Sequence, residues 1–388
     1  MDEGLIYLLL ICGLMIVPRG LQRFRLPAPL TCFLVGMLML LVLPGRHSSA
    51  VHLSAVLGIT ALFLYAGLEV DLRALLAQRG PLLRYLLVRL LAVACFSALA
   101  MYALALPWQA AVLLTLAVLT SSTGFIIDSL DRFDMAPEER FWVTNQAISG
   151  ELLALGLMFV VLQADSLQAL ASSSGILLAM ALATPLAYFA LARWILPHAP
   201  GSEFSLLVTV ALAAAFVTNR LGVEYLLGAF LAGMVAHLLS HRLPALASEG
   251  NMHAVKLFSN FFLPFYFFRQ GTLVPPGAFG WEALAIGLGL CLLIPVRLWG
   301  MYRQRRRQGD PPVRAWRIAL SLSPTLIFTL VLAEILSQRF HLPEAWFGGL
   351  LLYAGINTLL PSLVLRSAFD PEAGPASKPG ASADAMNP

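Results

Sequence analysis

Thr120-Ser121-Ser122-Thr123-Gly124 stands inside the apolar segment 108–130 and decides what kind of helix that segment can form. Ser and Thr side chains compete for backbone hydrogen-bond partners, and Gly costs helix stability, so this run weakens a helix in its middle. A break there, to which we expect Gly124 to contribute, frees carbonyl and hydroxyl oxygens that can bind an ion. The alternative is that small hydroxylated residues are simply common in membrane helices.

A second interruption, Ser321-Leu322-Ser323-Pro324-Thr325, occupies a comparable position in segment 315–338. Pro324 removes one helical hydrogen bond, which favours a break at this point. Two broken helices in corresponding positions of two halves of a chain point to a transporter binding site. The matched pair favours function over coincidence, and we expect the two broken helices to be the middle members of an inverted repeat.

The composition of the 388 residues is that of a chain surrounded by lipid. Hydrophobic residues make up 59% and charged residues only 12%, about half the charge density of a soluble domain. Soluble proteins rarely expose that much apolar surface, so the composition excludes a water-soluble enzyme. The sequence has no glycine-rich phosphate-binding loop after a strand, so we expect ion gradients to drive transport, with no cofactor.

Thirteen apolar segments approach the roughly 20 residues that a membrane-spanning helix needs. The predicted spans are 4–18, 27–44, 51–70, 81–106, 108–130, 141–163, 167–196, 204–219, 221–240, 256–274, 278–302, 315–338 and 342–365. We therefore predict an all-α membrane protein with about 13 transmembrane helices, in which the fourth to sixth and the eleventh to thirteenth spans form inverted repeats. The expected organisation is one transmembrane domain, residues 1–366, and a disordered cytoplasmic tail, residues 367–388.

The distribution of the 25 Lys and Arg residues predicts the orientation of the chain. Nineteen of them fall at the loops that follow odd-numbered spans or in the tail, and three fall on the other side. Because basic residues collect on the cytoplasmic side, we expect the N-terminus outside and the C-terminus in the cytoplasm. We interpret the basic run 303–317 as a cytoplasmic anchor, with anionic lipid as a second possibility and no nucleic acid as a partner.

Glu151 is the strongest single functional candidate. It lies near the middle of the otherwise apolar segment 141–163. A carboxylate at that depth costs about 2.5–3.5 kcal/mol on insertion scales, and such residues usually mark an ion or proton path. The alternative is a purely structural ion pair with a buried base.

Two arginines are candidate partners for Glu151. Arg297 lies near the cytoplasmic end of its span, so it either faces the site or reaches the lipid interface by snorkelling. Arg269 lies deeper and needs an acidic or carbonyl partner, for which Glu151 or Glu69 is suitable. Arg89, toward the inner end of the fourth span, is expected to snorkel.

Four short stretches carry a family resemblance over nearly the whole chain up to about residue 365. They are Phe63-Leu64-Tyr65-Ala66-Gly67-Leu68-Glu69-Val70-Asp71-Leu72, Ser121-Ser122-Thr123, Leu227-Gly228-Ala229-Phe230-Leu231-Ala232-Gly233, and Phe261-Phe262-Leu263-Pro264-Phe265-Tyr266-Phe267-Phe268 followed by Gly271. In this order and spacing they resemble the monovalent cation:proton antiporter-2 family, the potassium-efflux and sodium/proton exchanger relatives. Each motif alone is weak, and the four in sequence are specific.

The resemblance implies an inverted-repeat fold, the sodium/proton antiporter fold, in which a mobile ion-carrying core bundle packs on a dimerising panel. Two crossed, broken helices belong to that core. The resemblance places Glu151 at or next to the family's essential acidic residue and Ser122 and Thr123 at the first helix break. It places Arg297 at the basic residue that faces the site.

This chain departs from the family pattern in three respects. Gly150 stands where many relatives have a second polar or acidic residue, and Arg269 stands at the position of a usual Ser. The extra cation at Arg269 either hinders cation binding or needs its own partner. Potassium-efflux relatives often carry a cytoplasmic nucleotide-binding domain, which we do not expect in this chain.

These features predict a secondary antiporter, not an enzyme, that exchanges a monovalent cation, Na⁺ or K⁺, for H⁺ by alternating access. The transported cation, the only metal expected, would exchange its water shell for oxygens of Glu151, Ser122 and Thr123, with H⁺ competing for the carboxylate. Arginines stay protonated, so one titrating carboxylate predicts one-for-one, electroneutral exchange. A cation channel or uniporter is one alternative, and a non-transporting, sensor-like relative, favoured by Arg269, is the other. We expect a homodimer in the bilayer of a bacterial inner (cell) membrane.

Overall fold

The computed structural model describes residues 3–24, 26–42, 49–71, 79–130, 133, 135–164, 166–199, 201–222 and 225–365, and every regular element in these ranges is helical. The α-helices are α1 (Glu3–Leu21), α2 (Ala28–Val42), α3 (Ser49–Leu68), α5 (Arg79–Leu104), α6 (Trp108–Leu119), α7 (Thr123–Leu130), α8 (Pro137–Gln163), α9 (Leu167–Trp194), α10 (Glu203–Arg220), α11 (Tyr225–Leu238), α12 (Glu249–Thr272), α13 (Trp281–Cys291), α14 (Leu293–Arg307), α15 (Pro312–Ser321), α16 (Leu326–Phe340) and α17 (Glu344–Val364). Three short 3-10 helices are η1 (Gln22–Phe24), η2 (Leu239–His241) and η3 (Pro276–Phe279). The predicted tail, residues 367–388, lies outside the described residues.

The described helices overlap all thirteen predicted spans, but they are not equally long or apolar. Eight spans pass by length and hydropathy, and the bent pair α15–α16 makes a ninth. Helices α1, α2 and α11 are apolar but shorter. Helix α12 is long, with 24 residues, but carries Asn, Lys and Arg side chains. The all-helical fold is therefore confirmed, and the count of thirteen spans stays a prediction.

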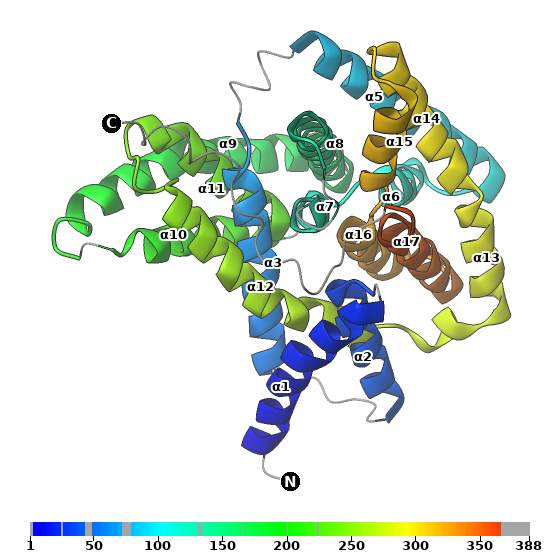
Figure 1. Cartoon of the computed structure of the whole chain (residues 1–388), viewed down its shortest axis with the longest axis horizontal. Helices are drawn as coiled ribbons and strands as arrows, with labels where there is room; N and C mark the ends of the chain where they lie inside the picture. The colour runs from blue at the N-terminus through cyan, green and yellow to red at the C-terminus, as the bar shows by residue number, and fades with distance from the viewer. Residues whose placement is uncertain are drawn as a thin grey trace, which may run out of the picture.

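Seven helices form one bundle, which we call the panel (α1–α3 and α9–α12). Helix α12 packs along α2 and α3, and α11 packs on α3, α9 and α10. In Figure 1, α3 and α12 lie near the middle of the molecule, with α9, α10 and α11 to their left and α1 and α2 below them.

Two pairs of glycines bring the panel helices into backbone contact. Gly67 of α3 faces Gly233 of α11, where a Cβ on either residue would collide with the backbone of the other helix. Gly36 of α2 and Gly271 of α12 form the same kind of close approach. Small residues let helices associate closely in lipid, where no hydrophobic force drives them together. Three of these glycines belong to the family-like stretches, and close packing is the physical reason for them.

The remaining helices form a second bundle, which we call the core (α5–α8 and α13–α17). Helix α6 packs on α5, α8 and α16, while α17 packs on α13 and α16. The order of the chain gives two three-span units, α5 to α8 and α13 to α17, each with a broken helix in the middle. This arrangement agrees with the predicted inverted-repeat fold (Figure 1).

Both predicted helix breaks are present. Helix α6 ends at Leu119 and α7 begins at Thr123, with Thr120 in an extended conformation. Helices α15 and α16 are bent by 42° across residues 322–325, which include Pro324. Gly124 lies in the first turn of α7 rather than in the break itself, and a Cβ there would meet the Leu62 side chain of α3 at 2.7 Å. Gly124 therefore serves the contact between core and panel.

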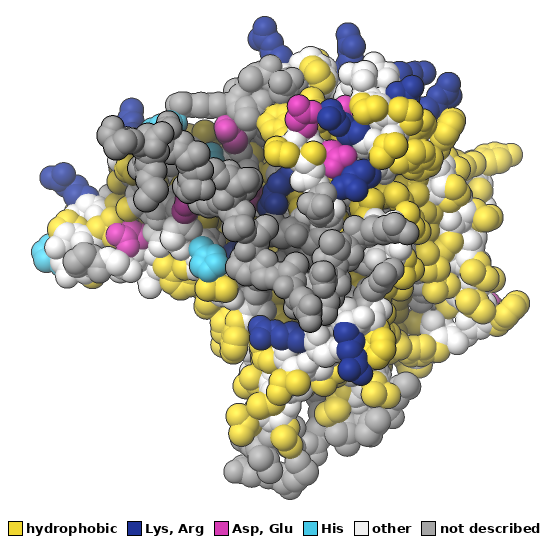
Figure 2. Space-filling view, in the orientation of Figure 1, with side chains coloured by type: hydrophobic (Ala, Val, Ile, Leu, Met, Phe, Trp, Pro, Cys, Tyr) yellow, Lys and Arg dark blue, Asp and Glu magenta, His cyan; other side chains and the backbone are white. Residues whose placement is uncertain are grey.

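The outer surface of the molecule is strongly apolar. Leu83, Leu87 and Leu91 of α5 are 58%, 56% and 64% exposed, and their four-residue spacing places them on one face of the helix. Figure 2 shows hydrophobic side chains covering the flank formed by the core helices. A continuous apolar flank of this kind is stable when lipid covers it.

The predicted cytoplasmic anchor, residues 303–317, is a folded structure with internal partners. Figure 2 shows Lys and Arg side chains gathered over the α14–α15 end of the molecule. Within it, Arg305 is 2% exposed, forms an ion pair with Asp310 and stacks 4.2 Å from the Trp142 ring. Arg317 donates to Glu139 at 3.1 Å. These contacts tie the α14–α15 turn to α8.

Candidate ion-binding site at the crossing of two broken helices

Ser122 joins the two broken helices. Its backbone N–H donates to the Pro324 carbonyl at 2.9 Å. Its hydroxyl oxygen accepts hydrogen bonds from the backbone N–H groups of Ile327 at 3.1 Å and Phe328 at 3.3 Å. Because the first N–H groups of a helix have no partner within the helix, Ser122 acts as an N-cap for α16 from another part of the chain.

The carbonyl end of α6 is satisfied by side chains from three other helices. The carbonyls of residues 117–119 accept hydrogen bonds from Thr329 at 2.7 Å, Tyr353 at 2.7 Å and Arg89 at 2.8 Å. These donors come from α16, α17 and α5. The last carbonyls of a helix have no partner within it, so a break at membrane depth is tolerated only where neighbours supply such donors.

Glu151 of α8 lies at the N-terminal end of α7. Its side chain is 1% exposed, and its Oε2 accepts a hydrogen bond from the Thr123 backbone N–H at 3.1 Å. The positive end of the α7 dipole stabilises a carboxylate at this position. Among the described residues, no hydrogen bond reaches Glu151 Oε1.

Several other buried oxygens near the crossing make no hydrogen bond within the described structure. They are the hydroxyls of Thr120, Thr123 and Thr325 and the side-chain oxygen of Asn357. Buried polar groups are normally paired, so each of these unpaired oxygens calls for an explanation such as a bound ion or ordered water. Together with Glu151 Oε1, these oxygens are suitable ligands for a small cation.

Arg297 points into the crossing. It is 8% exposed, and its guanidinium donates to the carbonyls of Ser323 at 2.7 Å and Leu322 at 2.9 Å and to the Ser121 hydroxyl at 2.8 Å. Ser121 in turn donates to the Leu322 carbonyl at 2.6 Å. Arg297 therefore neutralises the carbonyl end of α15. The N–H groups that make these hydrogen bonds do not donate to Glu151.

The structure does not bring Arg269 to the same place. Arg269 is half-buried on α12 in the panel. It lies near His52 of α3 and Glu334 of α16. Within the described part of the chain, no hydrogen bond or ion pair joins its side chain to Glu151 or Glu69. Glu69 accepts a hydrogen bond from the Tyr65 hydroxyl at 2.6 Å.

Arg89 corrects one sequence-based prediction. The prediction that it snorkels toward the lipid interface is wrong, because its Nη2 donates inward to the Leu119 carbonyl and its Nη1 donates to the Tyr85 hydroxyl at 2.9 Å. Arg89 lies ten residues into α5, about 15 Å from its first residue.

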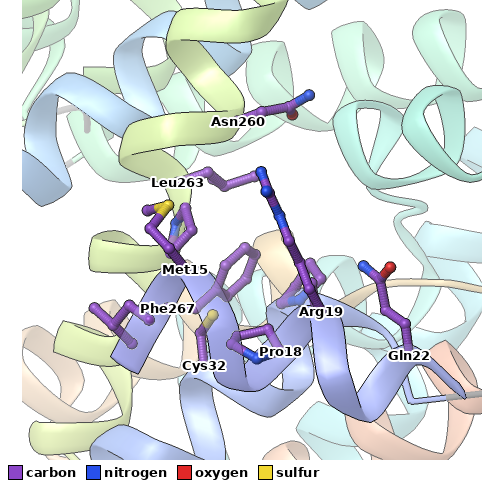
Figure 3. Close-up of a pocket in the computed structure, with 12 residues that line it drawn as sticks. Met15, Pro18, Arg19, Gln22, Cys32, Asn260, Leu263 and Phe267 are labelled. Atoms are coloured by element: carbon purple, nitrogen blue, oxygen red, sulfur yellow. The ribbon is translucent and has the colours of Figure 1, made fainter. Parts of the chain in front are cut away.

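A cavity outside the core lies away from this crossing. It has a volume of about 380 Å³ and is bounded by residues of α1, α2, α12 and the α1–α2 connection. In Figure 3 the Arg19 side chain extends from α1 toward α12, above Pro18 and beside Gln22. None of the residues that line it belongs to the broken helices or to α8, so the crossing stays the candidate ion site.

The comparisons with known proteins agree with the fold. Residues 6–368 match the model of the family described as sodium/hydrogen exchanger, transmembrane. The chain is 28% identical over 322 residues to KefB of Alkalimonas amylolytica, named as a K(+) efflux antiporter, with 77% of this chain and 47% of that protein covered. The chain thus spans about half the length of that curated relative.

Solved structures show the same fold. The sodium proton antiporter MjNhaP1 from Methanocaldococcus jannaschii, in a structure at pH 8, is similar with a TM-score of 0.65 and 16% identity, covering 92% of this chain and 94% of that one. A structure of the same antiporter from an electron-microscopy map also gives a TM-score of 0.65 at 16% identity, covering 97% and 100%. With the family model spanning both bundles and both broken helices, the chain belongs to the transmembrane sodium/hydrogen exchanger family.

Proposed function

We propose that this protein exchanges a monovalent cation, Na⁺ or K⁺, for H⁺ across the membrane, with Glu151 binding either ion in turn. The observation that carries the proposal is the state of the Glu151 carboxylate. It is fully buried at the crossing of the broken helices, one oxygen is held by Thr123 N–H, and the other has no described partner. Membership of the exchanger family supports the same activity.

The cation would bind between the free carboxylate oxygen and the unpaired hydroxyls. Glu151 Oε1 and Thr123 Oγ1 are the first ligands in this proposal, and the hydroxyls of Thr120 and Thr325 are the next. Ser122 has a supporting role, because its oxygen already accepts two backbone hydrogen bonds. Oxygen ligands of this kind replace the water that a cation loses on entering the protein.

Proton and cation compete because both neutralise the same buried carboxylate. Burial without an ion favours the neutral, protonated acid, whereas a bound cation favours the ionised form. Arginine cannot be deprotonated in proteins, so Arg297 and Arg89 contribute fixed charge and do not carry protons. With one exchanging carboxylate, the expected stoichiometry is one cation for one proton, which moves no net charge.

Alternating access would come from movement of the core against the panel. Glu151 is 1% exposed in this conformation, so the site must open by a rearrangement. The core and panel touch mainly through α3 with α7 and α8 with α9. We propose that the core carries Glu151 past this boundary while the panel holds a second copy of the chain in a homodimer. In this proposal the N-terminus is outside, the basic end is in the cytoplasm and the membrane is the bacterial inner membrane.

The test is cation-driven proton flux in reconstituted vesicles that contain a pH-sensitive dye. The wild-type protein should change the internal pH when Na⁺ or K⁺ is added, and Glu151→Gln should abolish the change while the protein remains folded. Glu282→Gln, an exposed glutamate at the start of α13, is the matched control and should transport normally. Cation flux that needs no opposing proton movement would instead indicate a channel, and wild-type-like exchange by Glu151→Gln would refute the proposal.

A further inference from the structure

Arg89 and Arg297 hold corresponding positions in the two three-span units. Arg89 of α5 donates to the Leu119 carbonyl at the end of α6. Arg297 of α14 donates to the Leu322 and Ser323 carbonyls at the end of α15. In each unit an arginine of the first span therefore caps the first half of the broken helix. The two arginines thus make the same kind of contact in the two units of the predicted inverted repeat.

Gly150 leaves room for Arg89 beside Glu151. A Cβ at position 150 would lie 2.9 Å from the Tyr85 hydroxyl, 3.1 Å from Arg89 Cζ and 3.2 Å from Arg89 Nη1. Tyr85 is 5% exposed and accepts the Arg89 Nη1 hydrogen bond, so it has little freedom to retreat. A side chain at position 150 would therefore compete with the guanidinium for the same space.

Arg89 is also a charged neighbour of Glu151, since its guanidinium lies against Gly150, the adjacent residue of α8. Other arginines that bond to described residues of α8 do so near its ends. Arg317 contacts Glu139 in the first turn of α8, and Arg314 contacts Glu138. Arg339 donates to the Leu162 carbonyl in the last turn. On the α5 side, Gly150, next to Glu151, thus faces Arg89 and Tyr85.

We propose that Arg89 is a second positioning residue of the site, which caps α6 and holds a fixed positive charge beside Glu151 in the space left by Gly150. The inference rests on the proposed exchange function and adds a specific electrostatic role to it. Proton and transported cation both carry one positive charge and both bind at Glu151. Arg89 therefore weakens the binding of both by about the same factor.

This role has a signature that a structural cap alone does not produce. In an exchanger of this kind, the apparent KM for the cation is constant at high pH and rises with proton concentration once protons compete. Removing the Arg89 charge strengthens both bindings. The KM plateau at high pH then falls by the factor by which cation binding is strengthened. The pH at which proton competition begins rises by the logarithm of that factor. At low pH the KM–pH curves of the variant and the wild type coincide.

The experiment measures the KM of Na⁺ or K⁺ against pH in vesicles for the wild type, Arg89→Gln and Arg89→Lys. A charge close to a carboxylate changes its ion affinity by about tenfold or more. We expect Arg89→Gln to lower the high-pH KM about tenfold and to move the onset by about one pH unit. Arg89→Lys, which keeps the charge, should follow the wild-type curve. Arg84→Gln removes an exposed charge from the same helix and should also follow it.

Gly150→Ala is the second variant, used if Arg89→Gln does not fold. It keeps the arginine but pushes the guanidinium away, so it should shift KM and onset in the same direction by a smaller factor. A wild-type KM–pH curve for Arg89→Gln and Gly150→Ala would overturn the inference. Equal losses of maximum rate in Arg89→Gln and Arg89→Lys with an unchanged curve would also overturn it, since they indicate a cap without an electrostatic role. Wild-type vesicles without cation-dependent proton flux would refute the exchange function, and this inference with it.

Discussion

Single side chains at the crossing divide into those that hold the broken helices and those that are free to bind. Ser122 and Arg297 use their polar atoms on helix ends. Thr123 offers its backbone N–H to Glu151 but leaves its hydroxyl unpaired. Adjacent residues of one motif therefore have different tasks, and substitutions should separate them.

Thr123→Val should weaken cation binding and leave the fold intact. Valine keeps the shape and the backbone N–H but removes the unpaired hydroxyl, so the apparent KM for the cation should rise about tenfold, the effect of about 1.4 kcal/mol. Ser122→Ala should instead lower stability by about 1–2 kcal/mol, because two N–H groups at the start of α16 lose their acceptor. Vesicle transport and thermal unfolding of both variants make the comparison. A large loss of stability in Thr123→Val would count against its assignment as a ligand.

The sequence identifies Glu151 because a lone acid in an apolar span is costly whatever its partner. It cannot identify the direction of an arginine, since depth along a helix does not say which face a residue occupies. Arg89 illustrates this, because one helical face leads to lipid and the adjacent one to the α6 carbonyls. The roles of Tyr353 and Thr329 were also missed, because each bonds a residue more than 200 positions away.

At the level of helices, apolar length predicts the spans and small polar runs predict the breaks, because both depend on local backbone hydrogen bonding. The pairing of helices depends on close approach. Gly67 and Gly233 face each other across α3 and α11. The sequence shows both glycines but not that they meet, because contact between positions so far apart is decided by the whole fold.

Gly233→Ala should therefore destabilise the panel. The added methyl group would collide with backbone of α3, and overpacking of this kind costs about 1–3 kcal/mol. Gly156→Ala in α8 is a suitable control, because beyond the adjacent residues and backbone of α8 itself no described atom lies within 4 Å of the position that its Cβ would take. We expect a lower unfolding temperature in detergent for Gly233→Ala and no loss for Gly156→Ala. Equal unfolding temperatures would show that the α3–α11 contact tolerates a wider spacing.

On the scale of the molecule, the contacts within each bundle are extensive, and those between the bundles are restricted to a few helices. Gly124 of α7 touches Leu62 of α3 at this boundary. If the core moves past the panel during transport, residues 62 and 124 must separate or slide.

A disulfide across this boundary should stop transport. The double variant Leu62→Cys with Gly124→Cys replaces two residues in contact, and the smaller Cys at position 62 makes room for the one at position 124. Oxidation should abolish proton flux, and a reducing agent should restore it. Each single variant, oxidised in the same way, controls for the native cysteines, all of which are free thiols. Full flux through the cross-linked protein would mean that this contact stays fixed throughout the cycle.

The three side-chain bonds at the end of α6 restrict how the site can travel. The donors belong to α5, α16 and α17. An axial shift of α6 alone would therefore break all three hydrogen bonds and leave buried carbonyls without partners. Tilting the whole bundle breaks none of them. The helices around the ion are thus expected to move as one rigid body and to keep their spacing while the site changes from one face of the membrane to the other.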